Sequence, residues 1–183
     1  QQTLQPDEWI VADDGDVKAT LSAGQTHLQC ERTYEGGASL AANMLAALKQ
    51  ATGDLIVVWE HDDYYAPNHI ELCAQKLTDR SGATGSEILR YFNVEHRMWV
   101  IMRNVGSALA NTAFTADHVP SMRLCAEEIL QTGQHNLDAR FWTKLHYSQK
   151  FIHRINTVVG IKGLPGRKGL GIGHRIEARR NWQ

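Results

Sequence analysis

The stretch that most constrains this chain is a short apolar run, Leu55–Trp59, which ends directly in the acids Glu60, Asp62 and Asp63. Such a run is typical of a strand buried in a parallel sheet, and ligands of open α/β sheets bind beyond the carboxyl ends of the strands. Carboxylates crowded there repel one another unless a cation or proton offsets their charge. Because Mg²⁺ and Mn²⁺ favour carboxylate oxygens, the stretch predicts a metal–diphosphate site. An acidic, solvated turn is the alternative.

A second stretch has the same construction. The expected strand Trp9–Ala12 ends in Asp13, Asp14, Gly15 and Asp16. If the two strands are parallel and end at the same edge, both acidic clusters should lie in one cleft. Asp-Gly is also a common turn signal, so a tight turn is the alternative here.

The order of expected elements predicts an α/β layered fold. Asn43 lies near the start of a helix expected over 40–50, where backbone N–H groups favour anions. Ser39 is the expected N-cap of that helix, and residues 81–85 read as a loop. The other expected strands cover 27–30, 88–92, 97–102 and the β-rich stretch 152–160, and the strands 88–92 and 97–102 are expected to form a hairpin. The other expected helices cover 68–76, 119–130 and 139–146.

Composition narrows the function. The formal net charge of −1 over 183 residues gives no case for generic nucleic-acid or membrane binding. No apolar run approaches the roughly 18 residues of a membrane span. The three cysteines are widely spaced and odd in number, which fits buried thiols in a reducing compartment. We therefore expect a cytoplasmic protein.

The C-terminal stretch GIKGLPGRKGLGIGHR is rich in glycine and carries Arg167, Lys168 and His174. Its glycines are too irregular for a P-loop or a dinucleotide fingerprint. A glycine-rich basic loop can still bring backbone N–H groups and cations onto phosphate. A flexible tail is the alternative.

Five segments over residues 2–145 together resemble glycosyltransferase family 2, in the order in which that family shows them. They are QTLQPDEWIVADDGD, GGASLAANMLAALKQATGD, DLIVVWEHDDYYAP, NVGSALANTAF and LDARFWTKL. The resemblance implies the GT-A fold, a Rossmann-like α/β arrangement with a mixed, mainly parallel sheet flanked by helices. It implies a catalytic domain over 1–160, short at its N-terminus, and a glycine-rich basic loop or tail over 161–183.

The resemblance also implies roles for individual residues. Asp14 matches the acid that contacts the nucleotide, with Asp13 beside it, and Asn43 matches the asparagine of the helix motif. Glu60 and Asp62 match the two acids of the DxD motif, with Asp63 an additional acid and Asp62 the principal metal ligand. Asp138 matches the catalytic base, and His174, in the C-terminal loop, matches a further contact to the metal or the diphosphate.

The sequence departs from the family pattern at several points. The resemblance begins after the family's opening strand and helix, which normally help to recognise the donor. Glu60 stands for the first aspartate of DxD, Ala42 for the usual arginine of the helix motif, and Leu137 for the glutamate before Asp138. Arg167, Lys168 and Arg175 could replace the lost cation.

The expected function is a metal-dependent, inverting glycosyltransferase of the hexosyltransferase type. It would use Mn²⁺ or Mg²⁺ and a UDP- or GDP-linked sugar, and would transfer the sugar to the hydroxyl group of an unidentified acceptor. Inverting transfer needs a general base and a cation for the leaving group, and both residue types are present. The alternatives are a non-catalytic sugar-nucleotide or glycan-binding module and, ranked last, a nucleotidyltransferase.

Overall fold

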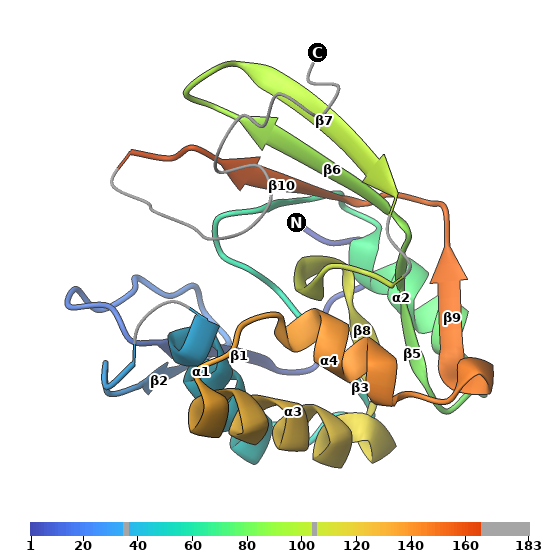
Figure 1. Cartoon of the computed structure of the whole chain (residues 1–183), viewed down its shortest axis with the longest axis horizontal. Helices are drawn as coiled ribbons and strands as arrows, with labels where there is room; N and C mark the ends of the chain where they lie inside the picture. Colours follow the sequence, from blue (N-terminus) through green and yellow to red (C-terminus); the bar gives the residue numbers. More distant parts are fainter. Residues whose placement is uncertain (35–36, 104–105, 166–183) are drawn as a thin grey trace.

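The computed structural model describes residues 1–34, 37–103 and 106–165 and shows a mixed α/β arrangement (Figure 1). Its central sheet contains β3 (Leu55–Val57), β8 (Ala113–Thr115), β5 (Ala83–Ser86) and β9 (Lys150–His153), in that order. β3 and β5 are both antiparallel to β8, and β9 is parallel to β5. Three of these four strands therefore run in one direction, and the sheet is mixed, as expected.

A second sheet lies at the opposite end of the molecule from α3 (Figure 1). Its order is β4 (Tyr64–Tyr65), β10 (Val158–Lys162), β6 (Ile88–Asn93) and β7 (Met98–Arg103). β6 and β7 form the hairpin that the sequence predicts. β10 extends to Lys162, so the first two residues of the expected tail belong to this sheet.

A third, two-stranded sheet pairs β1 (Trp9–Asp13) in parallel with β2 (Gln25–Gln29). β1 and β3 therefore belong to different sheets, and the two acidic strand ends do not share one sheet edge as expected. The starts of β1 and β3 are nevertheless joined, because Glu8 Oε1 accepts hydrogen bonds from the N–H groups of Thr52 and Gly53 at 2.8 and 3.1 Å.

Helices cover both faces of the central sheet. They are α1 (Gly37–Gln50), α2 (His69–Leu77), α3 (Val119–Thr132) and α4 (Leu137–Lys144), with short 3₁₀ turns at Leu109–Asn111, Ala116–His118 and Tyr147–Gln149. Alternate strand residues point to opposite faces. Ala113 accordingly packs with Cys73 and Leu77 of α2, whereas Phe114 packs into the cluster formed with α1, α3 and α4. None of the helices described is long and apolar enough to cross a membrane.

The expectation that residues 81–85 form a loop is wrong. Ala83–Ser86 is β5, an entirely buried strand in the interior of the central sheet. Its small residues fit because neighbours lie very close: a Cβ atom on Gly85 would lie 2.5 Å from the side chain of Ser107. The packing thus selects small residues that resemble a loop in sequence.

The main core should depend strongly on Phe141. This α4 side chain is fully buried, with its ring centroid 5.1 Å from that of Phe114. We expect Phe141→Ala to lower the free energy of unfolding by about 3–5 kcal/mol, measured by urea denaturation. Leu124→Ala, at an exposed position of α3, should change it by only about 0.5 kcal/mol. Equal losses in the two variants would contradict this account of the core.

Candidate active site

Three carboxylates gather where the chain leaves β3 and turns back into β4. Each of Glu60, Asp62 and Asp63 offers one oxygen atom, and these oxygens all lie within 4.8 Å of one another. The turn is closed by the backbone N–H of Asp63, which donates to the carbonyl oxygen of Glu60 at 3.3 Å. The structure therefore brings together the three residues predicted as metal ligands.

Two aromatic side chains fix the start of this turn. The backbone N–H of Glu60 donates a 2.7 Å hydrogen bond to the hydroxyl oxygen of Tyr65, a buried residue of β4. The Tyr65 ring stacks on Trp59, with the ring centroids 3.7 Å apart. The sequence reasoning assigned neither residue a role, because the contact joins the end of one strand to a strand of another sheet.

Lys162 places a positive charge inside the acidic cluster. Its Nζ lies 3.4 Å from Asp63 Oδ1, which also accepts a 2.9 Å hydrogen bond from the backbone N–H of Ile161. The side chains of Asp63 and Lys162 are only 3% and 10% exposed. Sequence reasoning missed Lys162, because its only local signal is a lysine at the start of a glycine-rich stretch.

The cluster holds more negative charge than one lysine offsets. Burial, followed by the charge of Asp63, raises the pKa of Glu60 to about 7, although Lys162 acts in the opposite direction. Burial also raises the pKa of Asp63, again opposed by Lys162. Ionising these buried carboxylates together is unfavourable unless a cation offsets their charge. Their oxygen atoms are the hard ligands that a divalent cation such as Mg²⁺ or Mn²⁺ prefers, so the cluster fits such a cation.

Asp138 lies in the first turn of α4 and acts on the same cluster. Its Oδ1 accepts a 2.8 Å hydrogen bond from the backbone N–H of Ala139, and burial raises its pKa. The charge of Asp138 in turn helps to raise the pKa of Glu60, so the two carboxylates interact. Asn136, with φ of 75°, occupies the N-cap position, so Asp138 is not the cap. Leu137, which replaces the family's glutamate, is a buried core residue.

Several contacts hold α4 in place. Glu128 of α3 accepts hydrogen bonds from Arg140 at 3.0 Å and from Lys144 at 2.7 Å. Trp142 Nε1 donates to Thr112 Oγ1 at 3.2 Å, and a Cβ atom on Gly106 would lie 3.2 Å from the Trp142 ring. The Gly106–Ser107 segment therefore lies close to both α4 and β5.

Asp14 forms a second polar group with α1. Its carboxylate accepts hydrogen bonds from Ser39 Oγ and, at 3.1 Å, from Asn43 Nδ2. The bond from Ser39 is the main reason that the pKa of Asp14 is lowered. α1 already includes Gly37, so Ser39 is not its N-cap and Asn43 lies in the second turn, both contrary to expectation. Within the part of the chain described, the buried Asn43 Oδ1 has no hydrogen-bond partner.

Asp13 has a different environment from Asp14. It accepts hydrogen bonds from the backbone N–H groups of Gly15 at 2.9 Å and Ala19 at 3.0 Å, and His27 Nε2 lies 3.5 Å away. The bond from Gly15 is the main cause of its lowered pKa. Asp13 thus organises a tight turn, which was the alternative interpretation of residues 13–16. Its neighbour Asp14 faces α1.

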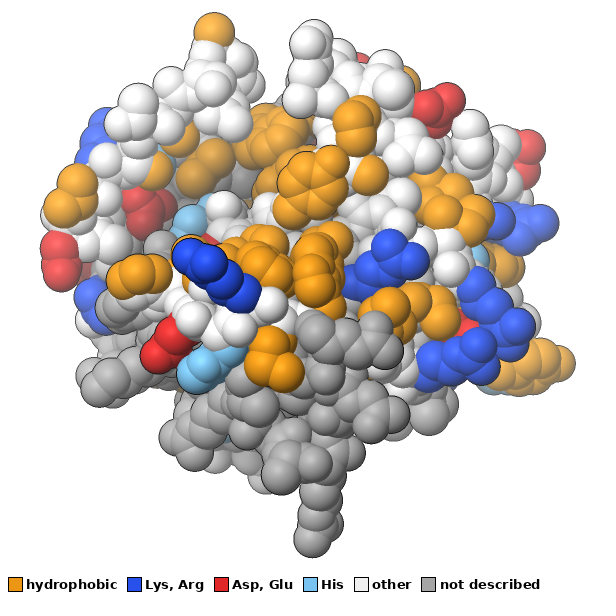
Figure 2. All heavy atoms as spheres, turned by 90° about the horizontal axis from the view of Figure 1, so that it is seen from above, with side chains coloured by type: hydrophobic (Ala, Val, Ile, Leu, Met, Phe, Trp, Pro, Cys, Tyr) orange, Lys and Arg blue, Asp and Glu red, His pale blue; other side chains and the backbone are white. Residues whose placement is uncertain are grey.

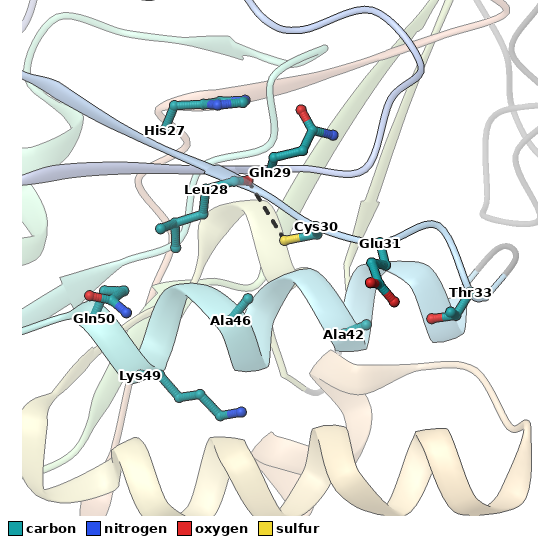
Figure 3. Close-up of a pocket in the computed structure, with 10 residues that line it drawn as sticks. All are labelled: His27, Leu28, Gln29, Cys30, Glu31, Thr33, Ala42, Ala46, Lys49 and Gln50. Carbon is teal, nitrogen blue, oxygen red and sulfur yellow. Dashed lines mark hydrogen bonds between the residues drawn. The ribbon is translucent and has the colours of Figure 1, made fainter.

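A cavity of about 510 Å³ lies between the end of β2 and α1 (Figure 3). Ala42 and Ala46 of α1 face the strand there, and the Cys30 thiol points to the carbonyl oxygen of Leu28. The small Ala42 side chain, where the family has arginine, helps to leave this space open. The cavity is lined by none of the clustered acids, so it is separate from them. Arg167, Lys168 and His174 lie outside the described residues.

The sequence was compared with known proteins and protein families. No curated protein matches it. The model of the family described as "Glycosyl transferase family 2" matches residues 1–151. The match spans the Asp14 group, the acidic cluster and α4, and it ends before β10 and Lys162. The chain therefore belongs to glycosyl transferase family 2, whose α/β fold is the GT-A fold and whose activity is glycosyl transfer.

Proposed function

We propose that this chain is a metal-dependent, inverting hexosyltransferase that moves a sugar from a UDP- or GDP-linked donor to the hydroxyl group of an acceptor. The observation that carries the proposal is the cluster of Glu60, Asp62 and Asp63 oxygens within 4.8 Å of one another. Asp138, on a separate helix, interacts with that cluster. The three free thiols support a reducing, cytoplasmic location.

Within this proposal, Asp62 is the principal ligand for Mn²⁺ or Mg²⁺. Asp63 Oδ1 is already engaged by Ile161 and Lys162, and the pKa of about 7 leaves Glu60 partly protonated at neutral pH. Among the described residues, Asp62 forms neither a hydrogen bond nor an ion pair, so its carboxylate remains available. When bound, the cation would stabilise the departing nucleoside diphosphate.

Asp138 is the proposed general base. An inverting transfer in one step requires a carboxylate that removes the proton from the acceptor hydroxyl as that oxygen attacks the anomeric carbon. The raised pKa of Asp138 makes it a better proton acceptor than an ordinary surface aspartate. No covalent nucleophile is needed.

Asp14 and Asn43 are the proposed contacts to the nucleoside. The lowered pKa keeps Asp14 ionised, so it can accept hydrogen bonds from hydroxyl groups of the donor. The buried Asn43 Oδ1, without a partner in the described chain, is a further acceptor beside it. Asp13 would support this group through its turn, and Arg167, Lys168 and His174 are proposed to contact the diphosphate.

A non-catalytic sugar-nucleotide or glycan-binding module is the second candidate function. Leu137 supports it, since this residue packs in the core where the family has an acid. A module would bind the donor without turning it over. The two candidates therefore differ in catalysis and not in affinity.

The first test is release of sugar from UDP- and GDP-sugars, with candidate acceptors added, in the presence of Mn²⁺. We expect turnover that EDTA abolishes and that excess Mn²⁺ restores. Turnover unaffected by EDTA would contradict metal dependence, and donor binding without any turnover would favour the module.

Mn²⁺ binding should also depend on pH. The cation competes with the proton on Glu60, whose pKa of about 7 is raised by burial. Affinity should therefore increase as pH rises towards 7 and level off above it. Calorimetry at several pH values measures this, and Glu60→Gln should flatten the profile. An affinity that falls as pH rises would contradict the assignment of Glu60 to the cluster.

A further inference from the structure

The outer face of the β4–β10–β6–β7 sheet is unusually apolar for an exposed surface. Leu89, Val100 and Val158 point inward and are buried. The alternate residues point outward, and strand pairing places them side by side in three rows. These rows are Tyr64–Val159–Arg90–Ile101, Ile161–Phe92–Trp99 and Ile88–Arg103. Figure 2 looks down on this end of the molecule and shows hydrophobic side chains gathered beside Lys and Arg side chains.

Three large side chains of this outer face are well exposed: Tyr64 is 57%, Trp99 45% and Ile101 60% exposed. Phe92 supports Trp99, with the ring centroids 4.7 Å apart. A single exposed apolar residue is ordinary, but a contiguous group on neighbouring strands indicates an interaction surface.

The charge of the same hairpin is positive. Residues 88–103 contain Arg90, Arg97 and Arg103 against the single acid Glu95. All three arginines are exposed, and none has an ion-pair partner among the described residues. The whole chain has a net charge of −1, so positive charge is concentrated here.

We propose that this outer face docks on the surface of an anionic lipid bilayer. Tryptophan is favoured at the membrane interface, aliphatic side chains such as Ile101 gain from entering it, and Arg90 and Arg103 can place their charges at the lipid phosphates. The face therefore offers both signals that peripheral membrane binding requires: apolar area and positive charge.

Two other occupants fit the outer face less well. A second copy packed on this face would bury Arg90 and Arg103, and the rows of the face contain no acid to pair with them. A nucleic acid would satisfy the arginines and stack on Trp99, but Ile101, Val159 and Ile161 have no π-surface on which bases stack. Of these three occupants, only the bilayer uses the aliphatic and the charged side chains together.

Docking would place the acidic cluster beside the bilayer. Tyr64 of the outer face directly follows Asp63, and the backbone N–H of Ile161 donates to Asp63 Oδ1 at 2.9 Å. The inference goes beyond the proposed function and does not depend on it, because binding to lipid can be measured without turnover.

The test is co-sedimentation of the full chain with vesicles of phosphatidylcholine mixed with phosphatidylserine, and with vesicles of phosphatidylcholine alone. We expect binding to the mixed vesicles that weakens as salt is added. The double variant Trp99→Ser/Ile101→Ser should have a partition coefficient that is lower by about tenfold or more. Each of Arg90→Gln and Arg103→Gln should lower the partition coefficient about fivefold. Leu124→Ser, an exposed apolar position on α3, should bind like the unchanged chain.

Circular dichroism and size-exclusion chromatography establish that each variant is folded. If the apolar double variant fails to fold, the exposed arginine variants and the salt dependence decide the question. Absence of binding to mixed vesicles, equal binding to neutral vesicles, or arginine variants that bind normally would overturn the proposal. Dimers or a complex with single-stranded RNA in the absence of vesicle binding would do the same.

Discussion

Asp62→Asn should abolish Mn²⁺-dependent turnover of the donor sugar and lower kcat/KM by at least about a hundredfold. Metal stabilisation of a leaving group contributes several kcal/mol, and each 1.4 kcal/mol corresponds to about a tenfold change in rate. Asparagine keeps the shape of the side chain and removes its charge. We also expect Mn²⁺ binding, measured by calorimetry, to weaken in parallel with turnover.

Asp62 is the clearest probe of the three acids. Asp63 forms a buried ion pair with Lys162, so Asp63→Asn would leave a buried lysine without its partner and destabilise the fold. Glu60 is partly protonated at neutral pH because burial raises its pKa to about 7, so removing its charge should have a smaller effect there. Asp62 has no such second role in the described structure.

Asp54→Asn is the matched control for Asp62→Asn. Asp54 is exposed and directly precedes β3, whereas Asp62 follows that strand. The control should leave metal binding and turnover unchanged. If Asp62→Asn retains both properties at the level of this control, the acidic cluster is not the metal site, and the proposed chemistry fails with it.

The parts of the site predicted from sequence are those encoded locally. An apolar run followed by acids indicated a strand end at Glu60–Asp63, and two strand-like runs joined by a short polar segment indicated the β6–β7 hairpin. Asp14 and Asn43 were singled out separately, each by its resemblance to a family motif, and the structure joins them by a 3.1 Å hydrogen bond. Each of these signals comes from a few consecutive residues or from an ordered series of motifs.

The features missed from sequence depend on contacts between distant segments. Lys162 meets Asp63 only because β10 pairs with β4 and β6. The sequence predicted a loop at β5 because the residues there are small. Those small residues are required by the close approach of Ser107, which no local pattern shows. Similarly, the adjacent residues Asp13 and Asp14 look equivalent in sequence. In the structure, Asp13 accepts hydrogen bonds from backbone N–H groups, whereas Asp14 accepts them from side chains of α1.

Asp138→Asn should lower kcat by about 10²–10⁴-fold while donor and Mn²⁺ binding persist, because it removes the proposed general base and leaves the metal ligands intact. Asparagine can still accept the hydrogen bond from the Ala139 N–H, so α4 should keep its first turn. The measurements are kcat for sugar transfer and calorimetric affinities for Mn²⁺ and the donor. Glu127→Gln, at an exposed position of α3, is the control and should retain full activity.

The same variant separates an enzyme from a binding module, because the two roles predict different patterns. The charge of Asp138 helps to raise the pKa of Glu60, so its removal should lower that pKa. Its removal also takes away an attraction for the doubly charged cation, so Mn²⁺ binding should weaken slightly. An enzyme that relies on Asp138 should therefore lose far more turnover than metal affinity. A module should show the small loss of affinity with no turnover to lose, and an unchanged kcat would exclude Asp138 as the base.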